Sequence, residues 1–334
     1  MPYAGKDLEV QKECVIFFEI EAISESEKES LVEALRTVLK NVIAAVADWK
    51  RMQGLMMEVV DTWQPVAKKS QQKALEEIYE YMQWLHEYFT FLGARTYSLI
   101  ESPEGVSRLV KDKKNGLGIL KSSKYVTLPE ENMVLDRGAK IKNTLGAKLF
   151  YLAKSTSKCH IHRDVYTDLL VLSIFDEYGK RIGEVRFAGL LSSEAYDADP
   201  SKIPWIRKKI HDVIELSNLR SRHSTKALAH ILKNIPTDEL FQCTIAELKV
   251  AALMQLSVKG LSATKVIIRK DILNAFYTMI MLMPKDYYNS QVLRKITKHI
   301  QAIFCTDRID WVVSFSDISL VNIYYTIRVS GQEI

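Results

Sequence analysis

Apolar side chains in the first quarter of the chain recur at intervals of three and four residues, which predicts a long amphipathic helix. The positions that form this stripe are Leu31, Val32, Leu35, Val38, Leu39, Val42, Ile43, Val46 and Trp49. Ser24 stands three residues before Glu27, the spacing of a capping box, so the helix is expected to begin there. It is expected to end at Trp63-Gln64-Pro65, and a second helix is expected over residues 70–88.

Short runs rich in β-branched and aromatic residues predict strands. Five such runs cover residues 14–22, 89–99, 149–152, 169–175 and 182–190. The last two flank a polar stretch, 176–181, and together they predict a hairpin. The weakly patterned stretch 101–146 is expected to form loops around short elements, and the basic run Lys111–Lys114 is expected to lie in one of them.

The last 130 or so residues carry the clearest pattern, and Pro200 and Pro204 mark its start. Helices are expected over 203–219, 224–234, 238–242 and 244–259, the last opened by a second capping box at Thr244 and Glu247. Two strands, a helix and two strands then follow, over 264–269, 275–283, 290–304, 311–315 and 320–329. Paired strands on either side of a helix are typical of a ferredoxin-like or ACT-like domain, which covers one sheet face and leaves the other free.

Composition narrows the class of protein. The chain has 334 residues with 47% apolar residues and a net charge of +5, so it can build ordinary globular cores. The charges alternate in sign, whereas a nucleic-acid-binding surface concentrates basic residues. The four cysteines, at 14, 159, 243 and 305, form no paired spacing, and no apolar stretch is long enough for a signal peptide or a membrane span. We therefore expect a cytoplasmic chain that binds neither nucleic acid nor membrane.

Three local groups of residues are candidates for metal binding, catalysis or dinucleotide binding, and in each case the sequence favours a role without that chemistry. Cys159, His160 and His162 are metal-ligand types, but no second pair completes a structural zinc site. His162, Arg163, Tyr166 and Asp168 include acid–base types, but no phosphate-binding turn or nucleophile elbow accompanies them, which favours a structural or interface role. The string 115–120 lacks the third glycine of a dinucleotide-binding turn.

A series of segments has a specific order and spacing along the chain. They are 38–49, 84–93, 162–166, 186–190 with Ser192, Ala195 and Tyr196, 203–204 with 207–209, 223–224 with 226–228, Pro236 with 238–242, and 284–286 with 288–289. This set resembles the large NAD-specific glutamate dehydrogenases of bacteria over roughly residues 14–330. The polar positions that match, without an assigned role, are His162, Arg163, Tyr166, Arg186, Tyr196, His223, Lys226, Asp286 and Tyr288.

The resemblance implies an N-terminal regulatory region built from ACT-like and PAS-like modules. With the element pattern, it predicts a multi-module α+β fold with antiparallel sheets and packed helices, divided in four. Residues 1–65 would be the remnant of an ACT-like domain, its last strand plus a helical arm, and 66–200 a PAS-like or second ACT-like module. Residues 201–243 would be a helical connector, and 244–334 a C-terminal ACT-like domain.

The same resemblance sets the expected function. The parent reaction would convert L-glutamate, NAD and water into 2-oxoglutarate, ammonia and NADH, but this chain would lack the catalytic domain. We therefore expect no catalytic, cofactor-binding or metal-binding residue in it, with NAD bound elsewhere in the parent enzyme. Its partners would be the rest of that enzyme, other subunits of a homo-oligomer, and an amino-acid effector. The alternative is a stand-alone α+β binding or scaffold protein from a split gene.

Overall fold

The computed structural model describes residues 15–101, 107–121, 145–159, 161–258, 263–272, 276–315 and 320–329. The chain divides into two compact units, residues 1–40 and 41–334. Helix α1 (Glu25–Asp61) begins in the first unit and ends in the second.

The first unit confirms one predicted feature and corrects another. The capping box forms, because Ser24 N donates to Glu27 Oε2 at 2.8 Å and Glu27 N donates to Ser24 Oγ at 3.4 Å. The predicted strand at 14–22 is wrong for residues 15–22, which form no regular element, and Cys14 lies outside the described residues. A run of apolar residues favours extended chain, but a strand also needs a partner backbone. Among the described residues none pairs with this segment, and Phe17 is 89% exposed.

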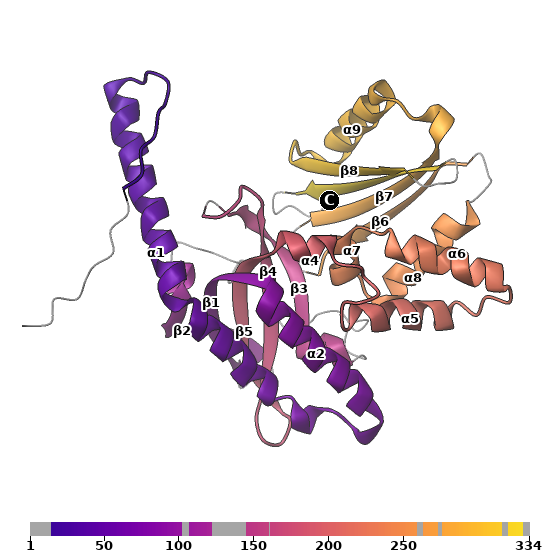
Figure 1. Cartoon of the computed structure of the whole chain (residues 1–334), viewed down its shortest axis with the longest axis horizontal. Coiled ribbons are helices and arrows are strands. Elements are labelled where there is room, and N and C mark those ends of the chain that lie inside the picture. The colour runs from indigo at the N-terminus through magenta and orange to yellow at the C-terminus, as the bar shows by residue number, and fades with distance from the viewer. Residues whose placement is uncertain are drawn as a thin grey trace, which may run out of the picture. The chain divides into compact units, whose positions relative to one another are not determined.

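In the second unit, a five-stranded antiparallel sheet has the strand order β2-β1-β5-β4-β3. Its strands are β1 (Phe89–Glu101), β2 (Ser107–Gly118), β3 (Phe150–Lys158), β4 (Tyr166–Phe175) and β5 (Arg181–Leu191). Helix α2 (Gln72–Tyr88) and the last turns of α1 bury their apolar side chains on one face of it (Figure 1). Trp63 completes this core, and its Nε1 donates to Ser173 O at 2.8 Å.

The predicted hairpin of β4 and β5 is confirmed. Its turn is closed by Asp176, whose Oδ1 accepts hydrogen bonds from Tyr178 N at 3.0 Å and Lys180 N at 2.8 Å. Gly179 has a φ of 76°, in the left-handed region that favours glycine.

Strand β2 corrects the expectation of loops at 101–146. The basic run Lys111–Lys114 lies within this strand, at a shift of register opposite Arg95 and Tyr97. The described parts of this stretch also contain the helical turns η3 (Ile119–Lys121) and α3 (Leu145–Leu149).

The predicted apolar stripe of α1 is also corrected. In the second unit the buried side of this helix runs through Ala45, Asp48, Met52 and Met56, while Ile43 is 67% and Val46 is 65% exposed.

A group of helices follows the first sheet. These are α4 (Ser193–Asp197), α5 (Ile206–Leu216), α6 (Arg222–Lys233), α7 (Thr237–Gln242) and α8 (Ile245–Ser257), and the remaining helical turns are η1 (Gln64–Val66), η2 (Lys69–Gln71) and η5 (Lys285–Tyr287). The capping box of α8 is confirmed, because Glu247 N donates to Thr244 Oγ1 at 3.2 Å and Thr244 N donates to Glu247 Oε2 at 2.8 Å. Helix α8 contacts both α5 and α6, so it belongs to this helical group.

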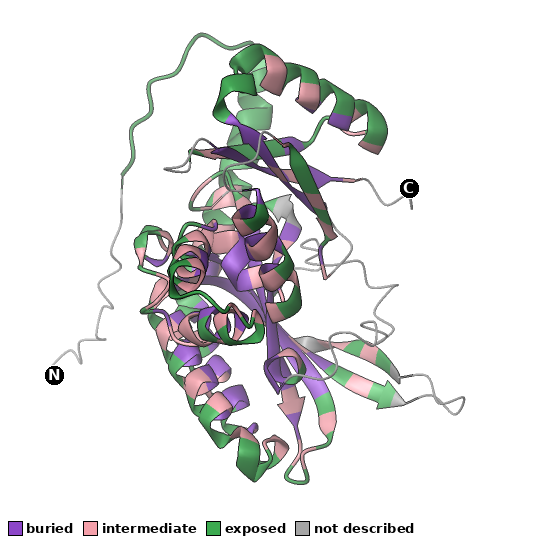
Figure 2. Ribbon diagram, turned by 90° about the vertical axis from the view of Figure 1, so that its right-hand side faces the viewer, coloured by how far each residue is buried: buried purple, intermediate pink, exposed green. Residues whose placement is uncertain are grey.

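The second sheet has the strand order β6-β7-β9-β8 and is also antiparallel. Its elements are β6 (Lys265–Lys270), β7 (Phe276–Pro284), α9 (Ser290–Phe304), β8 (Ile309–Phe315) and β9 (Leu320–Arg328). Helix α9 covers one face (Figure 1). The other face is not free, as its Ile280, Leu282 and Tyr324 pack against α8, and both middle strands are buried (Figure 2). The predicted α+β class with two antiparallel sheets is confirmed.

Candidate functional site

Buried ionisable side chains gather where the two sheets meet the helices, and the first cluster joins β3 and β4 to α4 and α7. Lys154 Nζ lies 2.6 Å from Asp168 Oδ1 and 3.2 Å from Asp238 Oδ1. It also donates to the hydroxyl of Tyr196 at 3.0 Å, and that hydroxyl donates to Asp238 Oδ1 at 2.9 Å. Asp168 Oδ2 accepts a further bond from Leu191 N at 2.9 Å. The four side chains thus form one connected network.

The protonation states in this first cluster favour a structural role over a catalytic one. Burial opposes the charge of Lys154, but the carboxylates of Asp168 and Asp238 outweigh it and raise the lysine pKa above its usual range. Burial, with the same two carboxylates, also raises the pKa of Tyr196. A protonated lysine is not a nucleophile and a neutral tyrosine is not a base at neutral pH. The cluster therefore ties the sheet to the helices.

The second cluster joins α5 and α7 to β6 of the second sheet. Arg269 Nη2 donates to both carboxylate oxygens of Glu239, at 3.2 and 3.1 Å, and both side chains are 10% exposed. Cys243 Sγ donates to Glu239 Oε2 at 3.3 Å. Lys209 of α5 belongs to the same cluster, and its Nζ donates to Leu240 O of α7 at 2.6 Å.

Burial dominates the titration behaviour of this second cluster. It lowers the pKa of Lys209 to about 8 and raises that of the Cys243 thiol, so the cysteine stays protonated and unreactive at neutral pH. Arg269 is therefore a buried ionic contact between the second sheet and the helical group.

A third contact joins the two sheets directly. The guanidinium of Arg328, on β9, lies over the ring of Tyr166, on β4, at 3.4 Å from the ring centroid. The same arginine pairs with Asp310 on β8. Stacking a guanidinium on an aromatic face adds a cation–π attraction to the packing.

The nine polar residues singled out from the sequence lie in different parts of the structure. Tyr196 lies in the first cluster and Tyr166 in the contact between the sheets. Arg186 is buried on β5 and donates from Nε to Glu184 Oε1 at 2.7 Å. Arg163 donates from Nη2 to Leu191 O at 2.6 Å, beside the peptide N–H that Asp168 holds. Tyr196 therefore joins a strand to two helices, whereas the other three make contacts to strand residues.

The remaining positions form no common site. Tyr288 packs edge-on against Phe315, with ring centroids 5.6 Å apart. The other four are exposed and lie in three places: His162 between β3 and β4, His223 and Lys226 on α6, and Asp286 on η5. The function of every one of the nine stays a prediction.

Sequence reasoning missed several members of the two clusters, above all Lys154, Lys209 and Arg269. One signal was available. Lys154 and Arg269 each directly follow an apolar run, and Lys209 lies on the helical stripe of Ile206, Ile210 and Val213. A charge at a position that the pattern buries indicates a partner elsewhere in the chain.

Metal binding finds little support in the described part of the chain. Of the predicted ligand types, Cys159 is buried, His162 is exposed and His160 lies outside the described residues. The one close group of ligand types found there is His211, Asp212 and Glu215 on α5. Asp212 already accepts from Lys208 Nζ at 2.7 Å, and the group is largely exposed, so we assign no metal site.

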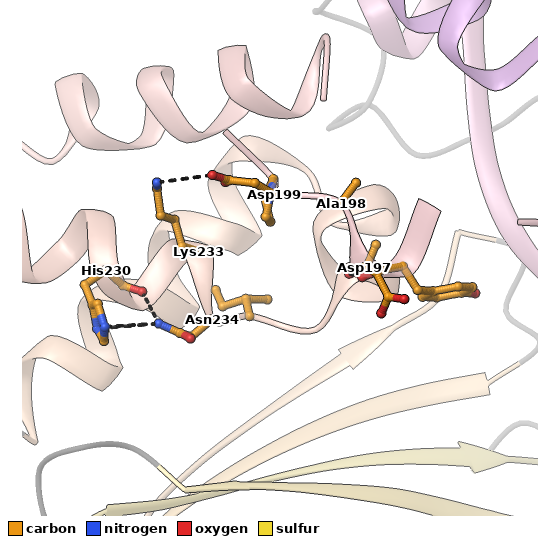
Figure 3. A pocket seen from close by; sticks show the side chains of 10 residues that line it. Asp197, Ala198, Asp199, His230, Lys233 and Asn234 are labelled. Atoms are coloured by element: carbon orange, nitrogen blue, oxygen red, sulfur yellow. Dashed lines mark hydrogen bonds and ion pairs between the residues drawn. The ribbon is translucent and has the colours of Figure 1, made fainter. Parts of the chain in front are cut away.

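A surface pocket of about 420 Å³ lies between α4 and the α6–α7 connection (Figure 3). Its charges are mixed, because Lys233 Nζ lies 3.8 Å from Asp199 Oδ2 and Asn234 Nδ2 donates to His230 O at 2.8 Å. Its charged side chains, Asp197, Asp199 and Lys233, are exposed and of both signs, which gives no preference for one ligand class. Among the helices that the structure describes, none is long and apolar enough to cross a membrane.

Comparison with known proteins agrees with this architecture. Residues 203–259, the helical group, match the model of the glutamate dehydrogenase helical motif 1. Residues 265–334, the second sheet with α9, match the model of the glutamate dehydrogenase ACT2 domain. The fold therefore contains an ACT domain joined to a helical motif.

Relatives extend the match over the whole chain. The chain is 28% identical over 333 residues to an NAD-specific glutamate dehydrogenase of Pseudomonas aeruginosa, covering 98% of the chain and 20% of the relative. It is also 28% identical to the enzyme of that name from Halomonas elongata, covering 96% of the chain. A more distant relative, from Mycobacterium tuberculosis, is 20% identical over 254 residues. The chain is thus related to a region of the large NAD-specific glutamate dehydrogenases, and it spans about a fifth of the length of these first two relatives.

Proposed function

We propose that this chain is a regulatory and oligomerisation segment, from the N-terminal part of an NAD-specific glutamate dehydrogenase, that lacks the catalytic domain. Its role would be to hold subunits together and to transmit an amino-acid signal to a distant active site. The observation that carries the proposal is the buried Arg269–Glu239 pair, which links the ACT sheet to the helical motif. A change in the ACT sheet can therefore be passed to the helices through a contact that is costly to break.

The chemistry of the described residues supports the non-catalytic half of this proposal. The best-placed reactive groups, Lys154 and Cys243, are held protonated, and Tyr196 has a raised pKa. Purified chain with glutamate and NAD is expected to form no NADH, measured by absorbance. Measurable turnover that scales with chain concentration would contradict the proposal.

The oligomerisation half has its own test. Sedimentation velocity across a wide concentration range is expected to show a dimer or larger species. A monomer at every concentration would contradict an assembly role while leaving the binding of an effector open to a separate measurement.

The regulatory half predicts that the chain binds an amino acid. A thermal-shift panel of amino acids at millimolar concentration is expected to raise the melting temperature for at least one of them, because a ligand that binds only the folded state stabilises it. No shift with any member of the panel would count against an effector role.

A further inference from the structure

The face of the five-stranded sheet opposite α2 carries charges in its interior. Successive residues of a strand point to opposite faces, and Val185 and Phe187 belong to the core under α2, so Arg186 lies on the other face. Arg95 of β1 is directly opposite Arg186 in the register of the two strands. Two arginine side chains are therefore cross-strand neighbours, and Arg95 is 3% exposed while Arg186 is 1% exposed.

This arrangement is unfavourable without a counter-charge. Like charges directly opposite each other on a sheet repel, and the cost grows when both are removed from water. Arginine does not escape by losing its proton, because its pKa is too high. Anionic groups are needed near both guanidinium groups.

The contacts of the two arginines differ. Arg186 donates from Nε to Glu184 Oε1 at 2.7 Å, and its guanidinium lies 3.9 Å from the ring centroid of Tyr97. Glu184 also accepts from Arg181 Nη2 at 2.6 Å. Arg95 Nε is buried and has no hydrogen-bond partner within the part of the chain that the structure describes.

The neighbouring strand makes room for Arg95. Gly116 of β2 is opposite Arg95, and a Cβ added there would lie 2.9 Å from Arg95 Nη2 and 2.6 Å from Leu120 O. Any side chain at this position would displace the guanidinium or the backbone. The glycine thus leaves room for the buried guanidinium of Arg95, whose Nε has no hydrogen-bond partner among the described residues.

We propose that Arg95, with Arg186 beside it, binds a small oxyanion, the carboxylate or phosphate group of a metabolite, on this face of the sheet. The planar guanidinium matches either group through two parallel hydrogen bonds, and a bound anion would offset the repulsion between the two arginines. The proposed regulatory role enters only in the choice of probes, because it suggests amino acids and keto acids. The site itself is inferred from the two arginines.

The position of the site also connects it to the ACT domain. Val171 of β4 is opposite Arg186, on the same face, and Ile272 packs on the cluster that contains Val171. Ile272 lies in the connection between β6 and β7. An anion at the arginine pair would therefore lie one residue across the sheet from a contact made by the ACT domain.

The test measures binding to the whole chain by thermal shift and by calorimetry. The probes are L-glutamate, L-aspartate, 2-oxoglutarate and inorganic phosphate, which separate carboxylate from phosphate recognition. At least one probe is expected to bind saturably to the unchanged chain. Arg95→Met is expected to weaken that binding at least tenfold while keeping or raising the melting temperature without ligand, because it removes a buried unpaired charge.

The matched control is Arg108→Met, the same substitution at an exposed position of β2, which should bind like the unchanged chain. Arg95→Lys, which keeps the charge and loses the planar fork, should bind with intermediate affinity and serves if Arg95→Met does not fold. Two results would overturn the proposal: no binding of any probe at millimolar concentration, or equal binding by the unchanged chain and the Arg95 variants. In the second case an effector binds elsewhere, and the proposed regulatory role survives.

Discussion

The two sheets of the second unit bury different kinds of side chain. The four-stranded sheet buries apolar residues on both faces, with Met279 and Ile323 under α9 and Ile280 and Leu282 towards α8. The five-stranded sheet also packs apolar residues on both faces, and its face under α2 buries Asp168. Its other face buries Arg95, Glu184 and Arg186.

The difference separates a sheet with an apolar interior from one that also buries charged side chains. A well-packed apolar interior is usually at least as stable as a buried ionic one, so buried charges need a reason beyond stability. In the four-stranded sheet the charges stand at strand ends, where Arg269 and Arg328 reach towards neighbouring elements. We infer that the four-stranded sheet is attached through a few ionic contacts, whereas the five-stranded sheet buries charges among its own strands as well as at its contact with the helices.

The largest expected effect tests the charges of the five-stranded sheet. Asp168→Ala removes the buried carboxylate paired with Lys154 and the acceptor of Leu191 N. The ammonium is then left with the partly exposed Asp238 as its remaining carboxylate partner, and a buried donor is left without its acceptor. The expected loss is about 3–5 kcal/mol of unfolding free energy, measured by urea denaturation.

A nearby exposed pair supplies the control. Lys158 and Asp164 lie 2.8 Å apart, with side chains 41% and 67% exposed, so Asp164→Ala is expected to cost less than about 1 kcal/mol. Equal losses for the two variants would show that burial does not set the strength of the pair.

The next effect tests how the four-stranded sheet is attached. Arg269→Met leaves the Glu239 carboxylate buried without its cation, and the expected cost is about 2–4 kcal/mol. Compared with the unchanged chain, hydrogen exchange should accelerate more in β6 and β7 than in β4 and β5, because the four-stranded sheet loosens while the five-stranded sheet stays closed.

Two further variants sharpen that result. Arg294→Met is the same change at an exposed position of α9 and should leave exchange unchanged. Adding Glu239→Leu to Arg269→Met should recover part of the lost stability, since it removes the carboxylate that Arg269→Met leaves without its cation. Uniform acceleration across both sheets would contradict a modular attachment.

The sequence predicted the elements of the four-stranded sheet closely, and the reason is local. Helix α9 occupies the expected residues 290–304, because its apolar period is regular and Asn289 caps it by accepting from Gln291 N and Val292 N, both at 2.9 Å. Each strand of this sheet is a short run of apolar residues bounded by polar or turn residues. Local pattern therefore sufficed for this domain.

What the sequence did not predict depends on contacts between distant segments. Strand β2 has a broken pattern around Lys111 and becomes a strand through its pairing with β1. The buried clusters join residues from β3, α5, α7 and β6, and no local rule places these side chains together. Tyr166 and Tyr196 did lie at contacts between elements, but what each contributes to function is still a prediction.

A smaller effect uses pH to probe the junction between helices and ACT sheet. Lys209 has a pKa of about 8 in the folded chain, while an unfolded lysine has a pKa of about 10.4. Between these values the unfolded chain binds more protons, so the contribution of Lys209 to stability rises with pH. The difference in unfolding free energy between the unchanged chain and Lys209→Met should therefore shift by about 1 kcal/mol, in favour of the unchanged chain, from pH 8 to 9.

The groups that face Lys209 decide how this measurement is read. Arg269, Glu239 and Glu247 all act on the charge of Lys209. Arg269 has a raised pKa and keeps its charge in that range, while Cys243, with a pKa raised by burial, contributes in the opposite direction. Comparing the two chains at each pH cancels the cysteine contribution because both contain it. A difference that stays flat from pH 8 to 10 would show that Lys209 is fully charged in the folded state.

The smallest effect compares two helix starts that have the same hydrogen-bond pattern in different surroundings. Thr244 caps α8, whose side chains pack on the four-stranded sheet, so Thr244→Ala should lower the unfolding free energy of the second unit by about 1 kcal/mol. Ser24 caps α1 in the first unit, where the neighbouring side chains are exposed. Ser24→Ala should therefore increase hydrogen exchange in the first turn of α1 and leave the main unfolding transition unchanged. If both variants shifted that transition equally, the two units would unfold together, and the exposed start of α1 would belong to the same cooperative structure as the two sheets.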